Sequence, residues 1–121
     1  MQQRALIAVV DDDESVRESL PDLVRELGYE AGGFSSAEEF LASDRIAETK
    51  CLLLDIAMPG MTGLDLQREL TRRGLQIPIV FITAHGDDSV RRRLQAGGAV
   101  ECLLKPFSDT ALLEALHTAL Q

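Results

Sequence analysis

The sequence predicts an α/β fold, a doubly wound parallel sheet of five strands with five helices. Short apolar segments rich in Val, Ile and Leu alternate with segments whose apolar residues recur at helical spacing. The apolar segments are nearly continuous, which is typical of strands buried on both faces of a parallel sheet. The length of 121 residues fits one domain, so residues 1–121 are predicted to form a single unit.

Five segments are predicted to be strands. The four strongest cover residues 5–10, 51–54, 79–82 and 99–104. A weaker segment, residues 29–34, contains two glycines and therefore suits a strand at or near an edge of the sheet.

Helices are predicted between these strands. Apolar residues recur at helical spacing over residues 16–27, 90–97 and 112–120. The residues that can cap helix starts are Asp13, Ser36, Thr62 and Ser108. Glycines at positions 28, 74, 97 and 98 mark helix ends. Pro21 lies inside the first pattern and is expected to bend or locally weaken that helix.

Alternation of strands and helices predicts a sheet with helices on both faces and right-handed crossovers. Among doubly wound sheets, five strands suit the flavodoxin-like order 2-1-3-4-5. Ligands of such sheets bind beyond the carboxyl ends of the strands where the strand order reverses, here near the first and third strands.

Composition excludes several functions. The net charge of -8 argues against direct nucleic-acid binding by this domain, because such binding requires Lys and Arg to neutralise phosphates. The apolar runs are too short to cross a membrane and no signal peptide is visible, so a cytoplasmic location is expected. Cys51 and Cys102 lack metal-binding or redox spacing and are predicted to be buried, reduced thiols.

Acidic residues follow two of the predicted strands. Asp11 and Asp12 follow the first strand, and Asp55 follows the third. Carboxylates that share one edge of a sheet repel each other unless a cation compensates them, and oxygen ligands suit Mg²⁺. We therefore predict a Mg²⁺ site here, whereas Asp13 is predicted only to start the first helix.

Asp55 is predicted to be a nucleophile toward phosphorus, because a carboxylate beside Mg²⁺ can form an acyl phosphate. The phosphoryl oxygens then need cations and hydrogen-bond donors. The Thr83 hydroxyl, the Lys105 ammonium and the backbone amides near Ala57 and Ala84 are predicted to lie at the same edge.

The chain resembles the receiver domains of two-component response regulators over essentially its whole length. The matching strings are VVDDDESVR at 9–17, LLLDIAMPGMTGLDL at 52–66, FITAHGD at 81–87 and LLKPF at 103–107. The strings SSAEEFL, MPGMTG and TAHGD look most like the branch of the nitrogen-fixation regulator. Members of that branch often carry a C-terminal helix-turn-helix domain.

The resemblance implies that Asp55 is the phospho-acceptor. It implies that Asp12 binds Mg²⁺ directly, that Asp11 binds it directly or through water, and that Ala57 supplies a backbone carbonyl.

For Thr83 and Lys105 the resemblance implies contacts to phosphoryl oxygens. The donor would be a histidine kinase or a phosphotransfer protein. The chain would catalyse only its own phosphorylation and dephosphorylation, and would control an output partner or a transcription-regulating domain outside this chain.

One departure from the family pattern is Cys102, which occupies a position where family members commonly have Tyr or Phe. Either the face formed by the fourth helix, fifth strand and fifth helix responds through backbone movement, or its coupling to the acceptor is weak. We expect backbone movement, because the acceptor, the threonine and the lysine are present.

Two further features remain open. His85 either orders a water near the acceptor or is solvated, and we favour solvation. Residues 91–93, all arginine, are either a solvated face or part of a phosphorylation-dependent homodimer contact through the same face as Cys102.

Three alternative functions fit the sequence less well than that of a receiver domain. A Mg²⁺-dependent phosphohydrolase would need an acidic residue where Ala57 stands. In a flavodoxin-like cofactor binder the cofactor phosphate would be repelled by the aspartates after the first strand, and this sequence has no Gly-rich phosphate loop in their place. A degenerate receiver used only for docking is opposed by the intact acidic pair, acceptor, threonine and lysine.

Overall fold

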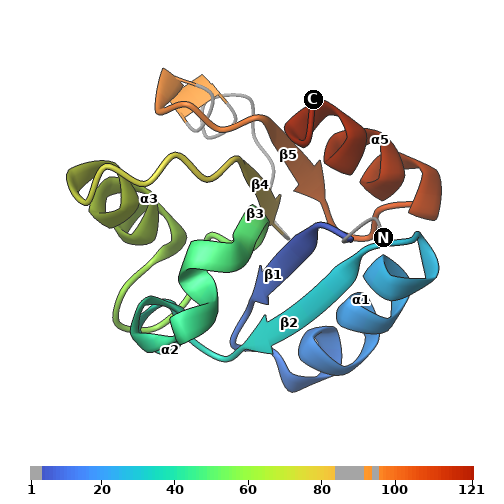
Figure 1. The fold of residues 1–121 in the computed structure, drawn as a ribbon, viewed down its shortest axis with the longest axis horizontal. Helices are drawn as coiled ribbons and strands as arrows, with labels where there is room; N and C mark the ends of the chain where they lie inside the picture. The colour runs from blue at the N-terminus through green and yellow to red at the C-terminus, as the bar shows by residue number, and fades with distance from the viewer. Residues whose placement is uncertain (1–3, 84–91, 94–95) are drawn as a thin grey trace.

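The computed structural model describes residues 4–83, 92–93 and 96–121, and these contain one parallel sheet of five strands (Figure 1). The strands are β1 (Leu6–Val10), β2 (Glu30–Phe34), β3 (Thr49–Asp55), β4 (Ile79–Thr83) and β5 (Glu101–Leu104). Their order in the sheet is β2-β1-β3-β4-β5, which confirms the predicted order 2-1-3-4-5. The glycine-containing strand β2 is an edge strand, as predicted.

The described residues form four α-helices and one 3₁₀ helix. They are α1 (Glu14–Glu26), α2 (Ala37–Ala42), the 3₁₀ helix η1 (Asp44–Glu48), α3 (Gly63–Arg72) and α5 (Asp109–Ala119). Half of the fifth predicted helix, over residues 90–97, falls outside the described residues, and the described residues 92, 93 and 96 are helical.

The predicted caps are confirmed at all four α-helices. The side chains that accept a backbone N–H of the first turn are those of Asp13, Ser36, Thr62 and Ser108. The helix α1 extends through the buried Pro21 as one element, so this proline does not divide it. Gly28 follows the end of α1 with a φ of 104°, a conformation that favours glycine.

The sheet separates two groups of buried side chains. Figure 1 shows α1 and α5 on one face of the sheet and α2 and α3 on the other. The first face includes Val24 and Leu116, and the second includes Phe40 and Leu66, all fully buried. Strands β1, β3 and β4 are therefore covered on both faces, as their continuous apolar runs predicted.

Cys51 and Cys102 are both buried and unoxidised, as predicted. Burial raises the pKa of the Cys51 thiol to about 12. A thiol with such a pKa remains protonated and unreactive at neutral pH. Among the described residues, no helix has the length and apolar character needed to cross a membrane.

Candidate functional site

Four strands bring their carboxyl ends to one edge of the sheet. Asp55 and Thr83 are the last residues of β3 and β4, Asp11 follows β1, and Lys105 follows β5. The Lys105 N–H donates to the Thr83 carbonyl oxygen at 2.8 Å, so the end of β5 is attached to the end of β4. Parallel pairing thus places residues from distant parts of the sequence beside each other.

These strand ends surround a cleft with a volume of about 340 Å³. Its lining residues are Asp11, Asp12, Asp13, Asp55, Ala57, Thr83 and Lys105. The structure therefore brings together the predicted carboxylates, threonine and lysine. Cys102 packs in the core on the α3 face instead, and Ala84 and His85 lie outside the described residues.

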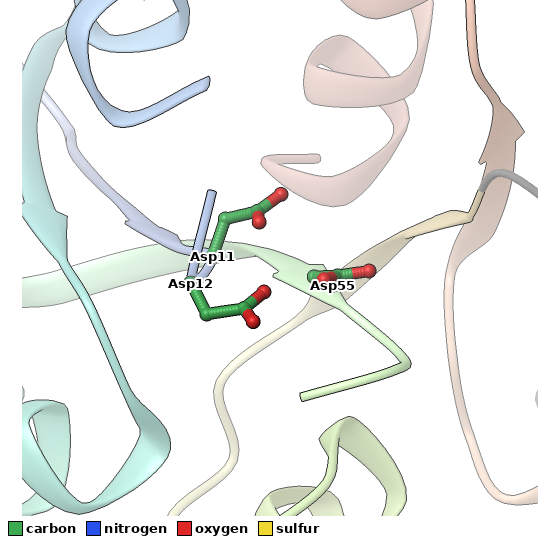
Figure 2. Close-up of side chains that lie close together, drawn as sticks. All are labelled: Asp11, Asp12 and Asp55. Atoms are coloured by element: carbon green, nitrogen blue, oxygen red, sulfur yellow. The ribbon is translucent and has the colours of Figure 1, made fainter. Parts of the chain in front are cut away.

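Three carboxylates approach each other in this cleft. One oxygen each of Asp11, Asp12 and Asp55 lies within 4.8 Å of the other two, and Figure 2 shows the three side chains at the ends of β1 and β3. Asp11 is 1% exposed and Asp55 is 9% exposed, whereas Asp12 is exposed. The site therefore holds two buried carboxylates and one that reaches solvent.

Burial, together with the nearby charge of Asp11, raises the pKa of Asp55 to about 6 from an ordinary value of 3.8. The charge of Lys105 and a hydrogen bond from the Ala57 backbone oppose this rise. Ionisation of Asp55 therefore destabilises the folded chain, and additional positive charge nearby would favour the ionised form.

Lys105 is the positively charged residue of this cleft, and it forms an ion pair with Asp11. Its Nζ lies 3.2 Å from Asp11 Oδ2, and the lysine side chain is 27% exposed. In this structure the ammonium group forms its ion pair with Asp11 rather than with Asp55. This partner was not predicted from the sequence.

Asp11 is held from three directions. Its Oδ1 accepts the backbone N–H of Asp13 at 2.9 Å, and its carbonyl oxygen accepts Arg17 Nη1 at 3.0 Å. Its own N–H donates to the Phe34 carbonyl oxygen at 3.1 Å. Arg17 was not predicted as a site neighbour, although it lies within the VVDDDESVR string.

The donor set fits a hard divalent cation. Carboxylate oxygens are the ligands that Mg²⁺ and Ca²⁺ prefer, and Mg²⁺ is typically bound through one or two carboxylates with several waters. Three clustered carboxylates with a single lysine leave a negative charge in the cleft, which supports a metal-binding role for Asp11, Asp12 and Asp55.

A larger hollow, of about 1140 Å³, lies at the amino ends of the strands, opposite the acidic cleft. Its charged lining residues are Arg4, Glu30, Glu48 and Lys50. These two cations and two anions balance each other, and the acidic cluster lies at the other edge. The smaller cleft, with its concentrated charge, is therefore the better candidate for chemistry.

Comparison with known sequences agrees with this geometry. The family model described as the response regulator receiver domain matches residues 7–117. The chain is 48% identical over 116 residues to nodulation protein W of Bradyrhizobium diazoefficiens, covering 96% of this chain and 51% of that protein. It is 44% identical over 122 residues to response regulator protein TodT of Pseudomonas putida, covering 100% of this chain and 54% of that protein. The chain thus spans about half the length of these curated relatives.

Solved structures show the same similarity. The response regulator StyR superimposes with a TM-score of 0.88 at 48% identity, covering 98% of this chain and 60% of that one. The structure titled FixJ-N gives a TM-score of 0.85 at 36% identity, covering 98% of this chain and 94% of that one. The motif match, the sheet order and the acidic cleft all agree with these comparisons, and the chain belongs to the response regulator receiver domain family.

Proposed function

We propose that this chain accepts a phosphoryl group on Asp55 from a phosphohistidine of a histidine kinase or phosphotransfer protein. The observation that carries the proposal is the cleft in which Asp55 meets Asp11, Asp12, Thr83 and Lys105. Receiver domains of response regulators are in general phosphorylated by histidine kinases, and family membership supports the same donor class here.

The metal of this site is proposed to be Mg²⁺. Asp11, Asp12, Asp55 and the backbone carbonyl of Ala57 would hold it. When bound, the ion would offset the charge of the carboxylates and of the incoming phosphoryl oxygens. Burial and the neighbouring Asp11 carboxylate raise the pKa of Asp55, so a bound cation would stabilise its ionised form.

The transfer step is a substitution at phosphorus. A carboxylate oxygen of Asp55 attacks the phosphorus, the new O–P bond forms, and the N–P bond of the donor breaks. The imidazole nitrogen keeps the bonding electron pair. The Thr83 hydroxyl and the backbone amide of Ala84 would donate to phosphoryl oxygens, and Lys105 would pair with another oxygen.

Loss of phosphate is hydrolysis of the acyl phosphate. Water attacks the phosphorus, the O–P bond to Asp55 breaks, and inorganic phosphate leaves. The chain would thus promote only its own phosphorylation and dephosphorylation. His85 would remain solvated in this step, so a His85→Ala variant should lose phosphate at the native rate.

The output face is proposed to include β5 and α5 together with the helix expected over residues 90–97. Leu104, on the edge strand β5, is 45% exposed and is the large apolar residue with high exposure among the described residues. Two phosphorylated chains are proposed to contact each other through this face, with Leu104 at its exposed strand. Residues 91–93 would extend this contact with positive charge.

Control of transcription would require a further domain. Residues 1–121 are proposed to be the receiver domain alone, and the chain spans about half of its curated relatives. The net charge of -8 supports an output that acts through another domain rather than through direct DNA binding by this one.

Mass spectrometry after treatment with acetyl phosphate and Mg²⁺ tests the proposal. The native chain should gain one phosphoryl group, and the gain should disappear in Asp55→Asn. The exposed Asp44, which lies in η1, provides a matched control, so Asp44→Asn should gain phosphate normally. An unmodified native chain, or one modified equally in Asp55→Asn, would contradict the proposal.

A further inference from the structure

Gln67 forms a buried contact between two distant parts of the chain. It lies in the middle of α3 and is 9% exposed. Its Nε2 donates to the carbonyl oxygen of Gly97 at 2.9 Å, across a separation of 30 residues. Gly97 precedes β5, so this hydrogen bond joins α3 to the connection that enters the edge strand.

The contact is close on both sides. A Cβ atom added at Gly97 would lie 2.9 Å from Gln67 Oε1 and 3.3 Å from its Nε2, so a side chain at residue 97 would require the Gln67 amide to shift. The backbone carbonyl oxygen of Gln67 accepts a hydrogen bond from the Thr71 hydroxyl at 3.0 Å. The amide side chain thus fits against the glycine backbone.

Open space flanks this hydrogen bond. One hollow of about 420 Å³ is lined by residues that include Leu64 and Arg93, and another of about 510 Å³ by residues that include Leu70 and Val100. Gln67 and Gly97 line both hollows. The hydrogen bond is therefore a specific attachment between α3 and this connection at a place where apolar packing is incomplete.

The first residue of α3 contacts the proposed acceptor, Asp55. A Cβ atom added at Gly63, the first residue of α3, would lie 2.6 Å from the carbonyl oxygen of Asp55. The Gly63 N–H donates to the Ile56 carbonyl oxygen at 3.1 Å. A reciprocal capping box between Thr62 and Asp65 fixes this first turn. A shift of the backbone at Asp55 would therefore press directly on α3.

From these contacts we infer that Gln67 is a positioning residue that couples the acceptor to β5. The inference rests on the proposed phosphorylation of Asp55. The helix α3 is a rigid element with one end against Asp55 and its middle hydrogen-bonded to Gly97. Movement of α3 either carries Gly97 with it or leaves a buried amide without its acceptor, which is unfavourable. This route acts on the backbone and needs no aromatic ring at Cys102.

Amide NMR spectra with and without beryllofluoride and Mg²⁺ test the coupling in the 121-residue chain. In the native chain we expect shifts both at residues 55–57 and at residues 101–104. In Gln67→Met, which keeps the length of the side chain but removes the donor, the shifts at 101–104 should fall about two-fold or more. Those at 55–57 should be retained.

Two further variants make the test specific. Gly97→Ala disturbs the same contact from its other side and should reproduce the loss at 101–104 with Gln67 intact. Gln76→Met is the matched control, because Gln76 is exposed and lines the same hollow as Leu70 and Val100. It should leave both sets of shifts unchanged. A purely structural role of Gln67 would alter the starting spectrum and leave the response to beryllofluoride intact.

The outcomes separate the two proposals. No response at 55–57 in the native chain would count against the proposed function itself. A native-size response at 101–104 in both Gln67→Met and Gly97→Ala would overturn the coupling role. Equal loss at 55–57 and at 101–104 would also overturn it, because Gln67 would then act on the acceptor site rather than on transmission. If Gln67→Met does not fold, the Gly97→Ala result decides.

Discussion

Replacing Asp55 by Asn should stabilise the metal-free chain at neutral pH. The pKa of Asp55 is raised from 3.8 to about 6, chiefly by burial and by Asp11. Between these two values the unfolded chain has already released its proton while the folded chain still holds it. The free energy of unfolding therefore falls as the pH rises from 3.8 to about 6, and the loss is complete above this interval.

The size of the effect follows from the same two pKa values. At 1.36 kcal/mol per pH unit, the raised pKa of Asp55 lowers the free energy of unfolding by about 3 kcal/mol at about pH 7.5 and by about 1 kcal/mol at about pH 4.5. Because the cleft opens to solvent and salt screens its charges, about 3 kcal/mol is an upper bound. Asp55→Asn removes this cost and should raise the free energy of unfolding by about 1–3 kcal/mol at the higher pH.

Urea unfolding in the presence of EDTA at both pH values measures this difference. Asp44→Asn serves as the control, because Asp44 is exposed in η1 and its replacement should change stability little at either pH. A stabilisation by Asp55→Asn that is equal at the two pH values, or larger at the lower one, would refute the electrostatic explanation.

Three other perturbations follow from the geometry. Lys105→Met removes the ion-pair partner of the buried Asp11 carboxylate and should lower the free energy of unfolding by about 1–3 kcal/mol in urea titrations. If the same loss of stability occurs when Asp11 has also been replaced, the ion pair is not its cause. Gly63→Ala should lower the free energy of unfolding by about 1–3 kcal/mol through overpacking, because its Cβ would lie 2.6 Å from a backbone oxygen. Gly33→Ala is the control in the same assay and should be tolerated, because its Cβ would meet no atom nearer than 3.8 Å. Mg²⁺ at about one hundred times its dissociation constant should add about 2.7 kcal/mol to thermal stability analysed at a common temperature, and Asp12→Ala should abolish that gain.

Much of the fold was predictable because both faces of the central strands are buried. Nearly continuous apolar runs predicted four of the strands, and a weaker segment with two glycines predicted the edge strand β2. The alternation of five strands with helical patterns then favoured the flavodoxin-like order. The predicted bounds differ most at two strands: β3 begins at Thr49 rather than at Cys51, and β5 begins at Glu101 rather than at Ala99. Thr49 is buried and its hydroxyl donates to the Arg45 carbonyl oxygen at 2.9 Å. Thr49 can be buried because its hydroxyl is hydrogen-bonded, but as a polar residue it does not extend an apolar run and was therefore not predicted to belong to the strand.

The composition of the site was predictable for a topological reason. Carboxyl ends of parallel strands meet at one edge, so Asp55, Thr83 and Lys105 were expected together once their strands were assigned. The partner of Lys105 was not, because contact between Lys105 and Asp11 depends on side-chain conformations across 94 residues. Gln67 also escaped prediction, since nothing in the helical periodicity of α3 indicates a hydrogen bond to a turn 30 residues later.

The division of the core by the sheet has a consequence for how sequences of this domain can change. Side chains of α1 and α5 contact one cluster, and those of α2 and α3 contact the other. Substitutions on opposite sides share few neighbours, so their effects on the free energy of unfolding should add. A chain of this kind can therefore accumulate changes on the α1 and α5 side without readjusting the α3 side, where Ile56 and Met58 are packed. Two surfaces of one small domain can thus diversify independently.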